Sequence, residues 1–387
     1  MVRDEGGPGE TEPSSASNRF DSKRFDSMPP MVTRGQARPT LRDVAERAGV
    51  SVSTASLVFS GKGPVAEATG DRVRAAATEL GFTGPNPLAS SLRQGRSGAI
   101  GVLVEGRLRM AFRDPFAIAV LDGLAEVLET VPTGMLLIGQ PAGSGESVVP
   151  QLAPLALDAV VFSLCGPGEN PAVEHLAARG IPMFSTGVPG DRRITQVRVD
   201  ERAAGIAVAE HVRSLGHRRV AHVAMPLRPT STAGPVPDAE VRPGEANVPS
   251  VGRLLGFRDV FGADAAAVQT GDGSSFEGGR IAGRSLLDVP EHERPTAIVT
   301  QSDVIAAGVI VAAEELGLRV PDDLSVTGFD GVDLPWLPHR ITTMDQQGRE
   351  KGRILGTLVR KRLDGTRPRS VTQPVQLRVG TTTAPPA

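Results

Sequence analysis

Residues 40–63 read TLRDVAERAGVSVSTASLVFSGKG, two short amphipathic segments that meet at a glycine. The apolar residues of the first segment recur at the spacing of one helix face: Leu41, Val44, Ala45 and Ala48. Gly49 follows them and suits the left-handed turn that ends a helix. Ser51 suits the N-cap of a second helix. The apolar positions of that second helix are Ala55, Val58 and Phe59.

A third helix is predicted by apolar residues at the same spacing: Val73, Ala76, Ala77 and Leu80. Three short helices with a tight glycine turn between the first two are typical of a helix-turn-helix unit. If the second helix packs through its apolar positions, the side chains left outside are Val52, Ser53, Ser56, Leu57 and Ser60. The second helix of such a unit presents its N-terminal half to the major groove of DNA. The alternative is an ordinary helical cap on an enzyme, whose serine-rich face is only solvated.

The local charge favours contact with nucleic acid. Residues 31–98 carry nine basic and five acidic side chains, whereas the whole chain has a formal net charge of -2. A local excess of positive charge is what contact with phosphates requires. Charge and pattern together therefore favour DNA binding over a helical cap.

The composition limits the class of protein. The chain has 387 residues, of which 40% are hydrophobic, enough for two or three folded domains. Its single cysteine, Cys165, excludes an intramolecular disulfide and a cysteine-based zinc cluster. No apolar run is long enough to span a membrane, and residues 1–38 lack the apolar segment of a secretion signal. We therefore expect a cytoplasmic protein without membrane contact, preceded by a disordered leader over residues 1–38.

From Ala99 onward, short apolar runs alternate with helical patterns. The runs are AIGVLV, MLLIG, DAVVFSL, IPMFS, RVAHVA, TAIVT and DLSVTGF. The helical segments between them cover residues 116–128, 201–215, 276–287 and 304–316. This alternation predicts an α/β fold with two parallel sheets, helices on both faces of each sheet, and a ligand in the cleft between the sheets. The Pro- and Gly-rich segment 226–250 is predicted to be a mobile loop.

Several motifs together resemble the LacI family of transcriptional regulators. They include TLRDVAERAGVSVSTASLVFSGKGPV, RVRAAATELGF, PNPLASSLRQGRS, SLGHRRVAHV and TAIVTQSDVIAAGVIVAAEELGLRVPDDLSVTGFD, in the family's order. The resemblance implies a sequence-specific DNA-binding regulator, most often a repressor, that binds a pseudo-palindromic operator as a homodimer. It also implies a small-molecule effector, a sugar or another metabolite, and it implies no enzymatic activity, cofactor or metal.

The resemblance also divides the chain. It implies an N-terminal three-helix helix-turn-helix domain over residues 39–84 and a hinge helix with linker over residues 85–97. The remainder, residues 98–387, resembles a periplasmic-binding-protein-like core with two doubly wound parallel-sheet subdomains. We expect the N-subdomain over about residues 98–198 plus 347–375, and the C-subdomain over about residues 199–346 plus 376–387.

The resemblance assigns DNA contacts to seven residues. Val52, Ser53 and Leu57 fall where the family reads bases, and Ser51, Thr54 and Ser56 fall at its phosphate-contacting and capping positions. Leu92 matches the hinge residue that wedges into the minor groove. The alternative for Leu92 is a linker residue that packs on the core.

Two residues depart from the family's pattern in this domain. Leu57 stands where Arg is usual and cannot make the bidentate hydrogen bonds to guanine, worth about 1 to 3 kcal/mol, so the operator is expected to differ. Ala66 stands where a Ser usually caps the third helix, at an expected cost of about 0.5 to 2 kcal/mol.

For the effector, the resemblance points to Phe116, Arg253 and Asp303. Asp303 offers a carboxylate to hydroxyl groups, and Arg253 offers a forked donor. The alternatives are a helix N-cap for Asp303, a surface charge for Arg253 and a plain core residue for Phe116. Gly187 and Val188 replace a common polar pair, which weakens the case for a sugar, and Trp336 either lines the cleft or shields a crossover.

Enzyme signals are weak. GKGPVA at residues 61–66 imitates a nucleotide-binding fingerprint but follows a helix and contains Pro64. His217, His292 and Glu293 lack metal-ligand spacing and are expected at the surface. Two other classes stay open: a solute-binding receptor, which needs an export signal, and an α/β enzyme with a helical cap, which needs a catalytic constellation.

Overall fold

The computed structural model describes residues 39–61, 63–84, 96–105, 108–140, 147–163, 170–228, 230–237 and 248–387. The chain divides into two compact units, with the boundary between Pro87 and Leu88. The leader 1–38 and the hinge residue Leu92 lie outside the described residues, so what was predicted for them stays a prediction.

The N-terminal unit has three helices, α1 (Leu41–Ala48), α2 (Val52–Ser60) and α3 (Glu67–Leu80). A capping box opens α1, in which the Asp43 carboxylate accepts a hydrogen bond from Thr40 N at 2.7 Å and Asp43 N donates to the Thr40 hydroxyl. Gly49 ends α1 with φ of 64°, the left-handed conformation that favours glycine. The predicted helix-turn-helix arrangement is confirmed.

The core of this unit is small and apolar. Its buried residues are Val44, Ala45, Ala55, Val73, Ala76 and Ala77. Val58 and Phe59 pack against them, as the spacing predicted, and the ring of Phe59 meets that of Phe82 edge to face at 5.4 Å. An exposed ion pair between Arg47 and Glu79 joins α1 to α3.

The second unit contains two sheets. The six-stranded sheet has the order β12-β5-β4-β3-β1-β2, and its pairs are parallel. Its strands are β1 (Ala99–Glu105), β2 (Gly134–Gln140), β3 (Ala159–Ser163), β4 (Met183–Ser185), β5 (Ile194–Arg198) and β12 (Val371–Thr372). Its helices are α5 (Pro115–Leu128), α6 (Val149–Leu152), α7 (Pro171–Ala178) and α12 (Gly348–Leu363), with a 3-10 turn η2 (Leu108–Phe112).

The seven-stranded sheet has the order β13-β11-β10-β9-β6-β8-β7, with antiparallel strands only at its two edges. Its strands are β6 (Val220–Ala224), β7 (Gly234–Pro235), β8 (Ala267–Gln269), β9 (Ala297–Thr300), β10 (Ser325–Asp330), β11 (Thr342–Asp345) and β13 (Gln376–Arg378). Its helices are α8 (Glu201–Ser214), α9 (Val248–Phe261), α10 (Phe276–Leu287) and α11 (Asp303–Glu315). The prediction of two parallel sheets is confirmed.

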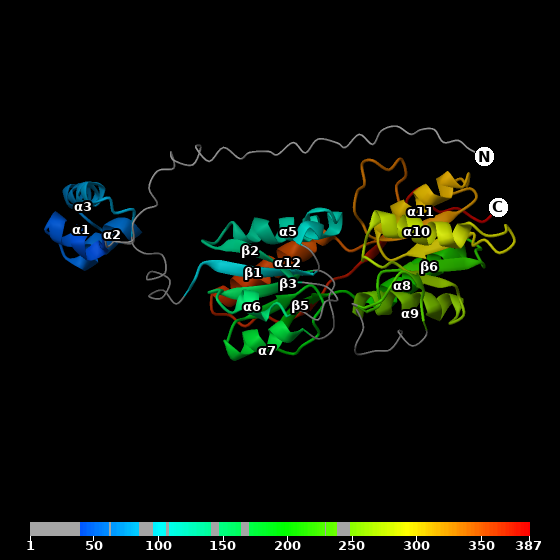
Figure 1. The fold of residues 1–387 in the computed structure, drawn as a ribbon, viewed down its shortest axis with the longest axis horizontal. Coiled ribbons are helices and arrows are strands. Elements are labelled where there is room, and N and C mark those ends of the chain that lie inside the picture. Colours follow the sequence, from blue (N-terminus) through cyan, green and yellow to red (C-terminus); the bar gives the residue numbers. More distant parts are fainter. Residues whose placement is uncertain are drawn as a thin grey trace, which may run out of the picture. The chain divides into compact units, whose positions relative to one another are not determined.

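Helices cover both faces of each sheet. Figure 1 shows α5 and α12 on one face of the six-stranded sheet with α6 and α7 on the other, and separate apolar clusters fill the two layers. The same view places α10 and α11 on one face of the seven-stranded sheet and α8 and α9 on the other, again over separate clusters. The predicted strands inside the two sheets are therefore buried on both sides, as expected of parallel sheets, whereas the edge strand β2 is largely half-buried or exposed.

Glycines set the closest helix contacts. A Cβ at Gly352 of α12 would lie 2.1 Å from the carbonyl oxygen of Val120 in α5, and one at Gly308 of α11 would lie 2.1 Å from that of Phe276 in α10. No side chain fits at either place, so the paired helices touch backbone to backbone.

The prediction of a mobile loop over residues 226–250 is wrong for part of that segment. Leu227 is fully buried, Gly234–Pro235 pairs with β8, and α9 begins at Val248. The Pro and Gly content suggested a loop, but the apolar Leu227 and Val236 are drawn into the core beside α9.

Candidate functional site

The N-terminal end of α2 carries a cluster of hydroxyl groups. Ser51 caps the helix, as predicted, because its Oγ accepts from Thr54 N at 3.1 Å. The same Oγ lies 2.8 Å from the hydroxyl oxygens of Ser53 and Thr54. Free helix N–H groups and hydroxyls at this end form a surface that hydrogen-bonds phosphate oxygens.

Apolar side chains stand beside these hydroxyls on the exposed face of α2. Val52 is 45% exposed and Leu57 is 37% exposed, unusual values for large apolar residues. Ser53 and Ser60 are exposed and Ser56 is half-buried, so the predicted outward face is the observed one. Leu57 leans over the following turn, where its Cδ2 would be 3.1 Å from a Cβ at Gly63.

The start of α3 lacks a side-chain cap. Ala66 occupies the N-cap position and makes no capping hydrogen bond, as its sequence predicted. Backbone bonds from Thr69 N and Gly70 N to Ala66 O close the first turn instead. The third helix is therefore held mainly by its packing on α1 and α2.

In the second unit, three aspartates gather at the carboxyl ends of strands. Asp114 caps α5, Asp303 opens α11 and Asp330 ends β10. Burial raises the pKa of all three, to about 7 for Asp303, and the negative charges of Asp303 and Asp114 raise the pKa of Asp330 further. Both halves of the core thus supply what we call the carboxylate cluster. Among the described residues it forms no group that could hold a metal ion.

Asp330 is the centre of this cluster. Its backbone has φ of 120°, a conformation that strains a side chain, and its Oδ1 accepts from Gln346 Nε2 at 2.8 Å. Gln346 in turn accepts from Lys351 Nζ at 3.1 Å, and Lys351 is a buried residue of α12. A polar chain therefore links Asp330 in the seven-stranded half to Lys351 in the six-stranded half.

Asp303 is fully buried, and its carboxylate is wedged against β10. Its Oδ2 accepts from Val332 N at 2.8 Å, while Oδ1 has no hydrogen-bond partner among the described residues and would lie 2.1 Å from a Cβ at Gly328. The alternative that Asp303 caps α11 is wrong, because Ser302 accepts from Ile305 N at 3.1 Å.

Arg253 is buried, so the surface-charge alternative is also wrong. Its Nε donates to Glu201 at 2.8 Å, its NH1 donates to Gln301 O at 2.6 Å, and its guanidinium lies 3.6 Å above the ring of Phe329. Arg253 therefore binds α8, α9 and the end of β9 together, and its charge faces Asp330.

Phe116 packs as the core alternative predicted, and its predicted contact with an effector stays a prediction. Its ring packs against Gly348 at the start of α12, as a core residue would, and lies 5.7 Å from Lys351 Nζ. It is nonetheless half-buried and follows Asp114, whose carboxylate accepts from Phe116 N at 2.9 Å. Phe116 therefore belongs to the border of the carboxylate cluster.

Two aromatic rings and one apolar turn follow other strands of the two sheets. Trp336 is 57% exposed and meets Phe276 edge to face at 5.4 Å. Both rings follow carboxyl ends of strands in the seven-stranded half, where aromatic walls for ligands are formed. Val188 is buried instead of facing outward, because Gln196 Nε2 holds the neighbouring carbonyls of Gly187 and Pro189.

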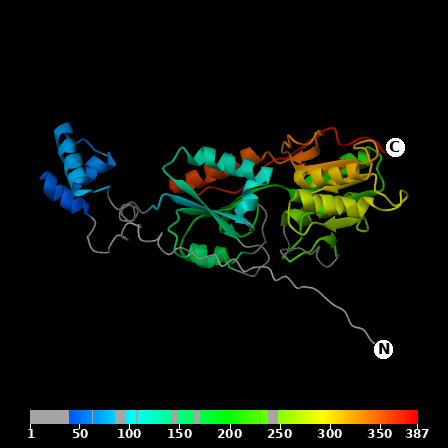
Figure 2. The same ribbon diagram turned by 45° about the horizontal axis from the view of Figure 1, so that its top comes forward.

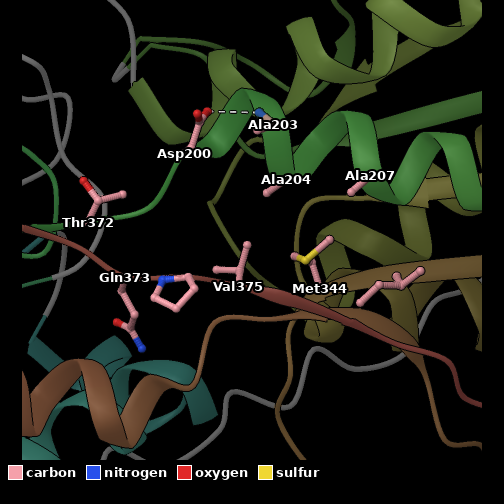
Figure 3. A pocket seen from close by; sticks show the side chains of 10 residues that line it. Asp200, Ala203, Ala204, Ala207, Met344, Thr372, Gln373 and Val375 are labelled. Atoms are coloured by element: carbon pink, nitrogen blue, oxygen red, sulfur yellow. Dashed lines mark hydrogen bonds between the residues drawn. The ribbon is translucent and has the colours of Figure 1, made fainter.

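A separate cavity of about 430 Å³ lies beside the crossover between the two halves (Figure 3). Its walls come from the start of α8, from β11 and from the segment between β12 and β13, and they are mostly apolar. Asp200 is used as the cap of α8, with Ala203 N at 3.0 Å. Gln373 Nε2 donates to Gln346 O at 3.2 Å and its backbone N donates to Arg198 O at 2.7 Å. The cavity therefore offers few free polar groups to a ligand.

The prediction that His217 lies at the surface is wrong. His217 is only 1% exposed, and its ring nitrogens contact Thr296 Oγ1, Ser325 Oγ and Ala384 O within 3.1 Å. It fastens the end of the chain to the seven-stranded sheet. His292 and Glu293 are exposed as predicted.

Sequence reasoning missed Asp330, Asp114 and Lys351. Asp330 ends a wholly buried strand and precedes a glycine, and Asp114 precedes a Pro that opens a helix, so both had a visible signal. Lys351 occupies a position of the apolar face of α12, together with Leu355 and Leu358. A lysine on a buried helix face signals a polar partner inside the protein.

A helix-turn-helix unit with an exposed hydroxyl-rich second helix, joined to a two-sheet core with a polar cluster at its strand ends, defines the class of DNA-binding regulators with a ligand-binding core. Residues 40–86 match the profile of the bacterial regulatory proteins of the lacI family, and residues 209–383 match that of the periplasmic binding protein-like domain.

Known proteins agree over most of the chain. An HTH-type transcriptional regulator of Mycolicibacterium smegmatis is 30% identical over 83% of this chain and 90% of its own. The HTH-type transcriptional repressor CytR of Escherichia coli is 27% identical over 84% of this chain and 90% of its own. The structure of the transcriptional regulator CelR in complex with cellobiose has a TM-score of 0.60 and 25% identity, over 89% of this chain and all of that one.

The chain therefore belongs to the LacI family, and it is a DNA-binding transcriptional regulator rather than an enzyme. Within the described residues, no helix is both long and apolar enough to cross a membrane.

Proposed function

We propose that the protein is a cytoplasmic repressor that binds a pseudo-palindromic operator as a homodimer. The exposed hydroxyl-rich face of α2 is the observation that supports operator binding. In this proposal Val52, Ser53 and Leu57 contact base edges, and Ser51, Thr54 and Ser56 contact phosphates. Leu92 acts as the minor-groove wedge. The similarity to CytR, which is a repressor, supports the sign of regulation.

The homodimer is supported by the edge of the six-stranded sheet. Among the described residues β2 pairs with β1 alone, and its segment GMLLIGQ carries no charge or proline. Leu136 of this strand is 40% exposed, and Ile118 of α5 is 45% exposed. An apolar edge strand that has no charged residue or proline to prevent further pairing is normally covered by another part of the protein or by another chain. In the proposal a second copy covers it, so Leu136→Lys would shift light scattering from dimer toward monomer.

The effector is proposed to occupy the cleft at the carboxylate cluster, between an N-subdomain at about residues 98–198 plus 347–375 and a C-subdomain at about 199–346 plus 376–387. Asp330 and Asp114 offer acceptors to ligand hydroxyl or amine groups, and Phe116 borders them. In this proposal Arg253 and Asp303 do not contact the effector, because they are bonded to other residues of the protein, and they stabilise the wall of the effector site. These acceptors favour a ligand rich in hydrogen-bond donors, and the cellobiose complex of CelR makes a sugar the first to test.

The test is selection of bound sequences from a random DNA pool by the full-length protein, with and without cellobiose. A palindromic consensus supports operator binding by a dimer. The proposal would be contradicted if no sequence were enriched with or without cellobiose and none were enriched with a panel of other sugars. A consensus that disappears on adding cellobiose would identify an inducer.

A further inference from the structure

The folded N-terminal unit brings no net positive charge of its own to a contact with DNA. Residues 39–84 hold five basic and five acidic side chains, so this unit is formally neutral. The excess noted for residues 31–98 comes from its flanks: Arg34, Arg38, Arg93 and Arg96. Because phosphate neutralisation supplies much of the affinity of DNA-binding proteins, positive charge elsewhere in the chain is of interest.

The parallel topology collects such charge at one edge of the six-stranded sheet. All its strands begin at this edge and the helices that connect them end there, so we call it the strand-start edge. Both views show the start of β1, in cyan, and the C-terminal end of α12, in orange-red, at the same end of the sheet (Figures 1 and 2). A hydrogen bond from the Arg96 guanidinium to Leu363 O confirms that they meet.

The loops and helix ends of the strand-start edge are strongly basic. Their basic residues are Arg96, Arg179, Arg192, Arg193, Arg360, Lys361, Arg362, Arg367 and Arg369. The acidic residues facing them are Glu129, Asp158, Glu174, Asp191 and Asp364. Arg193 is paired with Glu174 and Asp191, while Asp158 accepts from the backbone of Ser97 and Gly98. An excess of positive charge therefore remains.

Among the described residues, only Arg193 of these nine side chains has an ion pair. Arg96, Arg179 and Arg360 donate hydrogen bonds to uncharged groups instead. The other five are Arg192, Lys361, Arg362, Arg367 and Arg369. Lys361, Arg367 and Arg369 also reach solvent. Basic residues in a last helical turn offset the partial negative charge of the helix end, which accounts for Lys361 and Arg362. It does not account for Arg367 and Arg369, which follow the helix and precede β12.

The covalent connection brings this edge within reach of the DNA that the N-terminal unit binds. Residues 85–95 join Gly84 to Arg96, and a chain of that length extends at most about 40 Å. The opposite edge of the sheet carries the carboxylate cluster, which would repel phosphates. The two edges of the six-stranded sheet thus differ in the sign of the charge that lies beside them.

We propose that the strand-start edge is a second DNA-binding surface, which binds phosphates of the duplex without reading their sequence. The proposal rests on DNA binding by the family's helix-turn-helix unit and adds an interaction made by the core. Lys361, Arg367 and Arg369 are its principal donors.

The experiment compares two triple variants of the full-length protein. One carries Lys361→Gln, Arg367→Gln and Arg369→Gln. The matched control removes the same charge from exposed positions of the seven-stranded half, with Arg213→Gln, Arg218→Gln and Arg284→Gln. Fluorescence anisotropy gives the Kd of each for a random-sequence duplex and for the selected consensus, over a series of salt concentrations.

The first variant is expected to raise Kd on both duplexes by a similar factor, on the order of tenfold at low salt. The slope of log Kd against log salt is expected to fall by about 0.9 for each phosphate ion pair that the substitutions remove. The control is expected to keep the wild-type slope.

Equal slopes for both triple variants would overturn the proposal. A change of oligomeric state by light scattering with an unchanged slope would instead assign the edge to an interface between copies, and would also overturn it. If the wild type selected no consensus sequence, that result would contradict operator binding but would not test the second DNA-binding surface.

Discussion

The outer face of α2 and the carboxylate cluster use their side chains in opposite ways. On α2, Val52, Ser53 and Leu57 are exposed, and their contacts stay within α2 and the turns that flank it. At the carboxylate cluster, Asp303 and the neighbouring Arg253 are buried, and Arg253 is bonded to several elements at once. A surface of the first kind can change its specificity at little cost to the fold, whereas a site of the second kind cannot change without altering stability.

The largest effect is expected at Arg253. Arg253→Met leaves Glu201, whose side chain is 13% exposed, without its partner, so we expect a decrease of about 3 to 5 kcal/mol in the free energy of unfolding. Urea unfolding measures it. The double variant with Glu201→Gln is expected to recover part of this decrease, because no uncompensated carboxylate remains. If Arg253→Met alone lowered the free energy of unfolding by less than about 1 kcal/mol, this site would tolerate substitution as well as the exposed face of α2 does.

A pH effect is expected at His222, which packs behind Arg253. Burial lowers the pKa of His222 to about 3, and Gln301 Nε2 contacts its ring at 2.9 Å. Below about pH 6.5 only the unfolded state binds this proton, so stability falls as pH falls, by about 1.4 kcal/mol per pH unit. The raised pKa of Asp303 acts in the opposite direction between about pH 4 and 7.

Comparison with His222→Gln therefore isolates the histidine. The variant is expected to lose less stability than the wild type between about pH 7 and 5, by roughly 2 kcal/mol. His292→Gln, at an exposed position, serves as the control and is expected to follow the wild type. Identical pH profiles for His222→Gln and the wild type would mean that folding does not lower the pKa of His222.

On α2 the expected effect lies in binding rather than stability. Leu57→Arg places a forked donor on the exposed face, so we expect selection to enrich guanine at one symmetric pair, with a preference of about 1 to 3 kcal/mol for that base. The free energy of unfolding is expected to stay within about 0.5 kcal/mol of the wild type. Unchanged base preference in the selected pool would remove Leu57 from the reading surface.

The smallest effect is expected at the start of α3. Ala66→Ser supplies the absent cap and is expected to stabilise the N-terminal unit by about 0.5 to 2 kcal/mol. Hydrogen exchange of the first amides of α3 measures it, with Ser51→Ala on α2 as the matched removal of a cap. Faster exchange in Ala66→Ser than in the wild type would contradict the expectation.

The sequence predicted the N-terminal unit and the two sheets well because both depend on local periodicity. The apolar faces of α1, α2 and α3 and the buried runs of the strands are visible without knowing which segments meet. The carboxylate cluster and its link to Lys351 depend on long-range contacts, which periodicity does not reveal. Asp303 was singled out by the resemblance to a family, whereas Asp330 and Lys351 were missed. His217 was misplaced for the same reason, because Ser325 and Ala384, which surround it, are distant in the chain.

Gln373 has a mechanical consequence. Three stretches of chain run between the two sheets, and this one residue bonds to the other two, through its backbone to Arg198 and through its amide to the carbonyls of Gln346 and Gln347. Three independent tethers would let the halves twist and slide. Because the three stretches are fastened together at Gln373, we expect the two halves to move relative to each other mainly by rotation about this point.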